Sequence, residues 1–183
     1  MPNISDVITI EDWSQDWAAK FAGKAAVIRA ALGHSALRID HIGSTSIAGL
    51  AAKPIIDIQI SVADFADEEL SQAMAAAGYA WRRSNPELTK RYFREQPGTE
   101  RTHVHVRRLG SWHEQWALLF RDYLRSQNAA IEEYANLKRA LAKRFGHDRK
   151  AYTEAKGDYF WLTIRKADLW AAETGWRPGP SDG

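Results

Sequence analysis

The strongest constraint on the fold is a short polar turn between two apolar runs. Residues 37–42 and 54–62 are rich in apolar and β-branched side chains, which predicts two strands, the second of them buried. Gly43 and Ser44 follow the first run directly. Small residues let the backbone approach phosphate oxygens, and amides at the start of a helix bind anions. Asp57, inside the second run, could hold the magnesium ion that accompanies such phosphates. The stretch therefore predicts a nucleotide site.

Length, composition and charge limit the class of protein. The 183 residues, 45% of them hydrophobic, are enough for one domain or for a core with a helical annex. The net charge of +2 gives little support for nucleic acid as a partner. The sequence has no cysteine, which excludes disulfides, thiolate zinc sites and cysteine nucleophiles. No apolar run is long enough to cross a bilayer, and residues 1–6 lack a signal-peptide pattern, so we expect a cytoplasmic protein without a membrane partner. The oligomeric state stays open.

The periodicity predicts a mixed α/β core followed by helices alone. In the first part, further strands are expected over 7–10, 79–81, 88–94 and 102–109, and helices over 15–32 and 67–77. In the second part, helices are expected over 111–125, 129–145 and 148–172. Ser111 and Glu114 form a capping-box pattern at the start of the first of these. We therefore divide the chain into a core (1–110), a helical annex (111–175) and a loose tail rich in Gly and Pro (176–183).

Several motifs together resemble the GrpB-like family of small bacterial proteins. They are Asp12-Trp13-Ser14-Gln15-Asp16-Trp17, His41-Ile42-Gly43-Ser44-Thr45-Ser46, Gly49-Leu50-Ala51-Ala52-Lys53-Pro54-Ile55-Ile56-Asp57, His103-Val104-His105-Val106 and Phe120-Arg121-Asp122-Tyr123-Leu124-Arg125. The resemblance covers nearly the whole chain. It implies an α+β fold of the polymerase-β-type nucleotidyltransferase branch: a mixed β-sheet with flanking helices and a helical, bundle-like annex. The family is sometimes fused behind dephospho-CoA kinase, and the resemblance implies a fold more firmly than a reaction.

The resemblance also implies a chemistry for the central strand. In nucleotidyltransferases of this fold a Gly-Ser turn holds the triphosphate, and two carboxylates on one strand hold paired magnesium ions. Gly43 and Ser44 match the turn, and Asp57 matches the first carboxylate. Gln59 stands at the second carboxylate position, where an amide can accept a bond from a metal-bound water but brings no charge. A two-metal site would therefore be weakened. An aspartate is disfavoured inside a strand, which points to a compensating role for Asp57.

Two histidines form a second candidate cluster. His103 and His105 lie two residues apart on a predicted strand, so both imidazoles project from the same face. With Asp57 nearby they would make a two-histidine, one-carboxylate set that suits zinc, manganese or another transition metal, beside the magnesium expected from the resemblance. They could instead contact phosphate, act as a general base, or form a polar strand face against the annex.

Residues around these elements complete the predicted phosphate site. Arginine binds phosphate with two-pronged geometry, and lysine binds it as a point charge. We expect the nucleotide phosphates to contact His41, Gly43, Ser44, Thr45, Ser46, Lys53, Arg91 and Arg107. Asp57, His103 and His105 are the candidate catalytic residues, and the same three with Gln59 are the candidate metal ligands.

Three functions remain open on these grounds. The first is metal-dependent transfer of a nucleotidyl group from a nucleoside triphosphate to a small-molecule acceptor. The second is a binding module that holds a nucleotide or a phosphorylated, CoA-related metabolite without chemistry, which Gln59 favours. Nucleic acid binding is the third and weakest, because the chain has no long basic stripe.

Overall fold

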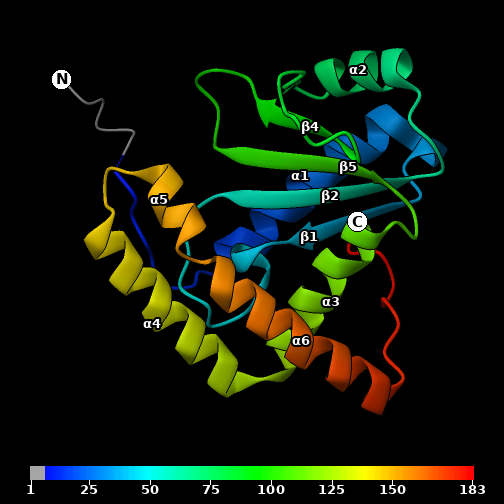
Figure 1. Ribbon diagram of the computed structural model, residues 1–183. Coiled ribbons are helices and arrows are strands. Elements are labelled where there is room, and N and C mark those ends of the chain that lie inside the picture. Colours follow the sequence, from blue (N-terminus) through cyan, green and yellow to red (C-terminus); the bar gives the residue numbers. More distant parts are fainter. Residues whose placement is uncertain (1–6) are drawn as a thin grey trace.

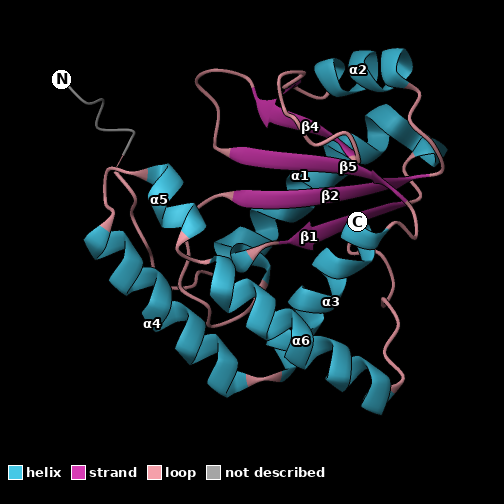
Figure 2. Cartoon of the chain, viewed as in Figure 1, coloured by secondary structure: helices cyan, strands magenta, loops and turns pink. Residues whose placement is uncertain are grey.

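The computed structural model describes residues 7–183, and within them the chain forms one five-stranded sheet flanked by six α-helices (Figures 1 and 2). Residues 1–6, on which the signal-peptide expectation rests, lie outside this part. The first half contains α1 (Asp16–Leu32), β1 (Arg38–Ile42), β2 (Ile56–Val62), α2 (Asp67–Ala76), β3 (Tyr79–Trp81), β4 (Lys90–Glu95) and β5 (Thr102–Arg108). The second half contains α3 (Trp112–Ser126), α4 (Asn128–Arg144), α5 (Arg149–Glu154) and α6 (Gly157–Thr174). This arrangement confirms the predicted α+β class.

The sheet is mixed, as predicted, and its strand order is β1-β2-β5-β4-β3. β2 runs parallel to β5, while β1 pairs with β2, β4 with β5 and β3 with β4 in antiparallel fashion. The parallel register sets Asp57 opposite His103, and Gln59 opposite His105. The two polar motifs of the sequence, 46 residues apart, thus occupy adjacent central strands.

One face of the sheet is apolar and packs against α1 and α2. Ile58, Val104 and Phe93 are fully buried there, together with Phe21 and Ile28 of α1. Because side chains alternate along a strand, Asp57, Gln59, His103 and His105 must project from the other face. Burial of the apolar side chains of β2 and β5 on one face therefore fixes the face from which their polar side chains project.

The C-terminal helices cover part of that polar face (Figure 1). α3, α4 and α6 pack on one another around a second buried cluster that includes Phe120, Leu124, Tyr134 and Ile164. α3 also contacts the sheet through Glu114, which is fully buried and accepts a hydrogen bond from the hydroxyl of Ser61 at 2.8 Å. Within residues 7–183, no helix combines the length and apolar character needed to cross a membrane.

Three predicted details are wrong. Residues 7–10 form no strand; Ile8 donates its amide to Gly146 O, and only Glu11 forms a β-bridge, with Ala52. The helix predicted over 148–172 is two helices, α5 and α6, with a turn before Gly157, a residue of low helix propensity. The capping-box prediction fails because Ser111 forms no side-chain cap, and the carboxylate of Glu114 accepts instead from Ser61 Oγ and Gly110 N.

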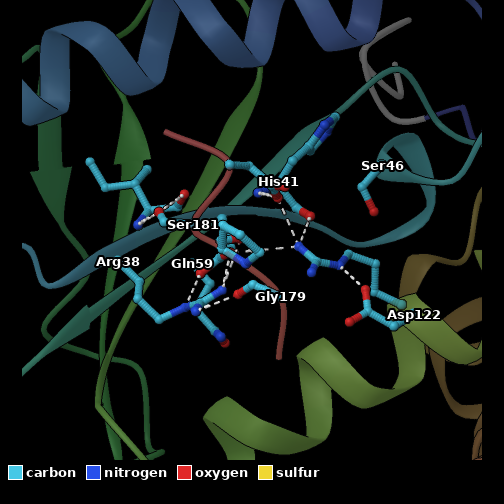
Figure 3. A network of polar contacts seen from close by, with 12 residues as sticks. Arg38, His41, Ser46, Gln59, Asp122, Gly179 and Ser181 are labelled. Atoms are coloured by element: carbon cyan, nitrogen blue, oxygen red, sulfur yellow. Dashed lines mark hydrogen bonds and ion pairs between the residues drawn. The ribbon is translucent and has the colours of Figure 1, made fainter. Parts of the chain in front are cut away.

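The tail, predicted to be loose, follows the edge strand β1 (Figure 3). Ser181 Oγ accepts a hydrogen bond from Ile39 N, and Gly183 N donates to Ile39 O. The carboxylate of Asp182 accepts from His41 N at 2.9 Å and from Arg121 Nη1 at 2.8 Å. An edge strand offers unpaired backbone groups, and here the tail satisfies them. The Gly- and Pro-rich composition favoured a loose tail because composition cannot show hydrogen bonds to residues far away in the sequence.

Candidate functional site

Asp57, His103 and His105 converge on the polar face of the sheet. His103 Nδ1 lies 3.0 Å from Asp57 Oδ1, and His105 Nε2 lies 3.8 Å from the same oxygen. One ligand atom from each residue can be chosen such that all three lie within 4.8 Å of one another. Nitrogen and oxygen donors lie about 2.0 to 2.2 Å from zinc, so these three could hold one ion after a small inward movement. The register of β2 against β5 produces the cluster, and the two-residue spacing of the histidines completes it.

The charge states of the cluster suit a ligand or base. Burial alone would raise the pKa of Asp57, but hydrogen bonds and charge interactions with both histidines outweigh it, so the pKa lies well below its usual range. Burial lowers the pKa of His105, an effect that Asp57 partly offsets. The carboxylate is therefore ionised and His105 neutral at pH 7. His103 Nε2 is buried and has no hydrogen-bond partner among the described residues.

The Gly43–Ser44 turn lies directly against this cluster. Gly43 has a φ of 69° and a ψ of −175°, a backbone conformation that is essentially restricted to glycine. A Cβ atom at this position would lie 2.5 Å from Asp57 Oδ2. The turn can approach the carboxylate only because the residue has no side chain, which explains the glycine in physical terms.

A cavity of about 240 Å³ connects the turn, the cluster and two lysines. Ser44 lines it from the turn, Asp57 and His103 line it from the sheet, and Lys53 and Lys156 add positive charge to its lining. Both lysine ammonium groups lie over the ring of Tyr152, at 4.7 and 4.6 Å from its centroid. The cavity is completed by Thr45, Ala52, Ile55 and Thr153.

A third lysine, Lys138 of α4, belongs to the same cationic group. Its side chain is 3% exposed, and its Nζ has no hydrogen-bond partner within residues 7–183. It lies over the ring of Tyr134, 4.4 Å from the centroid. Burial, with the nearby charges of Lys156, Arg139 and Lys53, lowers the pKa of Lys138 to about 7. Burial and Lys53 lower the pKa of Lys156 to about 8. The charge of Asp57 acts on Lys53 and Lys156, but positive charge exceeds negative charge in this group, which favours binding of a polyanion.

Gln59 projects from the same face of the sheet as the cluster, and its role as a metal ligand stays a prediction. Its side chain is fully buried, and its Nε2 donates to Glu114 O at 3.1 Å. Its Oε1 has no partner in the described part of the chain. The hydrogen bond to Glu114 O holds the amide nitrogen of Gln59 against α3. The residue at the second carboxylate position therefore also takes part in the packing of the sheet against α3.

His41 is not a phosphate ligand, because its ring projects from the apolar face. It stacks on Phe21 with 4.7 Å between ring centroids, and its Nε2 lies 3.0 Å from Thr45 Oγ1. Burial lowers the pKa of His41 to about 4. Thr45 donates its hydroxyl to Ile55 O, and Ser46 donates to Gly43 O at 2.6 Å. The hydroxyls of Thr45 and Ser46 therefore stabilise the turn itself, while Ser44 and Thr45 both line the cavity.

Neither predicted arginine is available for phosphate. Arg91 projects toward α2, where its Nε lies 2.6 Å from Asp67 Oδ1. Arg107 is on the site face, but its Nη1 forms an ion pair with Glu87 at 2.6 Å. The arginine of β4 that shares the face with the histidines is Arg94, which the register pairs with His103. Strand alternation within β5 correctly places Arg107 on the face of the histidines. The sequence does not show how β4 pairs with β5, so it could not indicate that Arg94, and not Arg91, shares this face.

The sequence reasoning also missed Lys138 as a site residue. Its position on a charged helix favours a solvated side chain, and no local signal distinguishes it from its neighbours. Lys156 stands in the charged segment before α6 and gave a weaker hint. Lys156 lines the cavity, and Lys138 lies near enough to Lys53 and Lys156 for their charges to interact, because the helical annex packs beside the turn.

Comparison with known proteins identifies the family. A model of the GrpB protein family matches residues 7–166. The chain belongs to the GrpB family. The crystal structure of conserved protein GrpB from Enterococcus faecalis superimposes with a TM-score of 0.81 at 29% identity, covering 88% of this chain and 99% of that one.

Two kinds of curated relative appear beside that structure. UPF0157 protein BH1888 of Halalkalibacterium halodurans is 35% identical over 88% of this chain and 83% of its own length. A protein named dephospho-CoA kinase from Mycolicibacterium paratuberculosis is 34% identical over 89% of this chain, but the match spans only 46% of its length. A GrpB-like region therefore also occurs within a chain about twice as long.

Proposed function

We propose that this GrpB-family protein transfers a nucleotidyl group from a nucleoside triphosphate to a hydroxyl of a small molecule, with the help of a divalent metal. The observation that supports this most is the cavity that Ser44, Lys53 and Lys156 line together with Asp57 and His103. Such a cavity offers a polyanion site on one side and a metal or base site on the other.

The triphosphate would lie on the lysine side. The hydroxyl of Ser44 can donate to a phosphate oxygen. Lys53, Lys138 and Lys156 supply more positive charge than the carboxylate of Asp57 balances, which leaves a need for further counter-charges. A bound triphosphate would provide those counter-charges. The α-phosphate would then lie toward Asp57, next to the acceptor.

The donor set fits a metal ion. Asp57, His103 and His105 would hold it, and two imidazoles with one carboxylate match Mn²⁺ or Zn²⁺ better than the Mg²⁺ expected from the fold, which prefers oxygen donors. When bound, such an ion supplies positive charge at the reacting phosphate. Asp57 is ionised and His105 neutral at pH 7, which are the protonation states that ligation requires.

The transfer step balances without further reactants. The acceptor hydroxyl oxygen attacks the α-phosphorus, a P–O bond forms, and the bond to the bridging oxygen breaks. Pyrophosphate leaves with the electron pair of that bond. The hydroxyl proton needs an acceptor, and His103 Nε2 is buried without a partner while its Nδ1 faces Asp57. His103 therefore has two candidate roles, third metal ligand and general base.

Gln59 supports a second candidate, a module that binds a nucleotide or a phosphorylated, CoA-related metabolite without chemistry. A site that retains one carboxylate of two, with the amide turned to α3, would bind phosphates but lack the second metal. The relatives named dephospho-CoA kinase give this ligand class its support. It predicts nucleotide or metabolite binding without release of pyrophosphate.

The test is calorimetric titration of the metal-free protein with Mn²⁺, with ATP and with both. We expect ATP to bind tightly only with Mn²⁺, and Asp57→Ala to abolish that binding. Asp64→Ala is the matched control, because Asp64 is exposed and pairs with Arg108 away from the cavity. Binding that survives in Asp57→Ala would refute the proposal.

Two further variants, His103→Gln and His105→Gln, decide whether His103 is a metal ligand or the general base. If His103→Gln weakens Mn²⁺ binding as much as His105→Gln does, His103 is a ligand. If it leaves the metal bound but stops pyrophosphate release, it is the base.

A further inference from the structure

A second cavity adjoins the proposed triphosphate site. It measures about 430 Å³ and shares four lining residues with the first: Lys53, Ile55, His103 and Thr153. His103 therefore faces both cavities. The second one extends from there to Tyr92 and Arg94 of β4 and to Arg149 at the start of α5.

The wall of this second cavity is strongly basic. Its charged residues other than histidine are Lys53, Arg94, Arg101 and Arg149, with Glu11 as the one carboxylate among the lining residues that the structure describes. Such a wall repels a cationic substrate and attracts an anion. A phosphorylated acceptor would complement this charge better than a neutral one.

Arg101 is the strongest indication of a missing ligand group. Its Nε is buried, with no hydrogen-bond partner in residues 7–183. Burial, with the charges of Arg149 and Arg94, lowers the pKa of Arg101. Arg94 is itself fixed by Glu95, with Nε and Nη2 at 2.9 and 2.7 Å from its two carboxylate oxygens. Arg101 thus has an unpaired Nε–H donor, near the guanidinium of Arg94, which Glu95 holds in a fixed position.

We infer that the second cavity binds the phosphate group of a phosphorylated acceptor, so that the acceptor's hydroxyl reaches His103. This rests on the proposed function and names its acceptor class. A phosphate dianion matches several cations at once, and arginine binds it with parallel hydrogen bonds. The aromatic ring of Tyr92 and the chain at Pro54 and Ile55 would border the rest of the molecule.

The chemistry of the step is unchanged by this assignment. The free hydroxyl of the acceptor attacks the α-phosphorus, and pyrophosphate leaves with the electrons of the broken P–O bond. The hydroxyl proton goes to a base, for which His103 is the candidate. The acceptor's own phosphate stays intact on the arginines. The product would be a phosphodiester that carries a nucleotidyl group at one end and the original phosphate at the other.

The experiment is calorimetric titration with inorganic phosphate at constant ionic strength. It uses the Lys138→Met chain, in which the triphosphate side is weakened, so that the heat reports the second cavity. Arg101→Gln is then added to it, with Arg101→Lys as a milder second variant. Arg108→Gln is the matched control, because Arg108 is an exposed arginine of β5 that pairs with Asp64. Mn²⁺–ATP binding is measured separately in the otherwise wild-type chain with and without Arg101→Gln.

We expect Arg101→Gln to weaken phosphate binding at least tenfold, Arg101→Lys to weaken it less, and Arg108→Gln to leave it unchanged. Mn²⁺–ATP should still bind to Arg101→Gln. Equal phosphate affinity with and without Arg101→Gln, or no phosphate binding in the Lys138→Met chain, would overturn the inference while leaving the nucleotide site standing. Absence of Mn²⁺–ATP binding in wild type would instead refute nucleotidyl transfer, and the acceptor role with it, even if phosphate still bound.

Discussion

We expect the buried charge of Lys138 to lower the free energy of unfolding, and a bound anionic ligand to offset this loss. A lysine whose pKa falls from 10.5 to about 7 is disfavoured at pH 7 by about 4 kcal/mol, since each pKa unit corresponds to about 1.4 kcal/mol. The contact of its ammonium with the Tyr134 ring offsets about 1 to 2 kcal/mol of this. Methionine is similar in volume and carries no charge. We therefore expect Lys138→Met to raise the free energy of unfolding by about 2 kcal/mol.

The pH dependence gives this prediction a second check. Between pH 7 and 10.5 the unfolded lysine still holds its proton while the buried one has lost it, so wild-type stability rises with pH across this window. The advantage of Lys138→Met should accordingly shrink as pH rises from 7 toward 10.5. Urea unfolding at several pH values measures both effects. Lys150→Met is the control, because that lysine is 84% exposed and its replacement should change stability by about 0.5 kcal/mol at most.

The same variant should lose its response to ligand. At a hundred times its dissociation constant, a ligand stabilises the native state by about 2.7 kcal/mol. Wild type should show this gain with Mn²⁺ and ATP, whereas Lys138→Met should start higher and gain little. If Lys138→Met instead destabilises the protein as an ordinary core substitution does, or if it keeps the full ligand response, Lys138 is a packing residue and the reasoning fails.

Two further changes test the turn and the strand beside it. Gly43→Ala should destabilise the protein by about 1 to 3 kcal/mol and abolish Mn²⁺ binding, because a Cβ atom there would collide with Asp57 Oδ2. Gly78→Ala is the control, since Gly78 also has a positive φ, of 88°, but its Cβ would have no neighbour within 4 Å. It should destabilise the protein without loss of Mn²⁺ binding. His41, with a pKa of about 4 against 6.5 unfolded, contributes stability that is lost as pH falls from 6.5 to 4, so wild type should lose about 3 kcal/mol more than His41→Gln over that range. Equal losses in urea unfolding at pH 7 and pH 4 would refute the assignment of His41.

The sequence could predict the parts of the site that lie within one strand or one turn. Asp57 inside an apolar run and the two-residue spacing of His103 and His105 follow from strand alternation, which every reader of the sequence can count. Gly43 and Ser44 follow from the chemistry of a tight turn. In each case the physical reason is local, and the neighbouring apolar residues fix which face is polar.

The tertiary structure decided which residues meet across elements. The register of β2 against β5 brings Asp57 to His103, and the packing of α4 beside the turn buries Lys138. It also turned His41 and Arg91 away and attached Gln59 to α3. Sequence alone determined the fold class and the polar residues of each strand, because those depend on local periodicity. The crowding of positive charge that defines the site arises between Lys53 and lysines as distant in sequence as Lys156, so only the folded chain decided it.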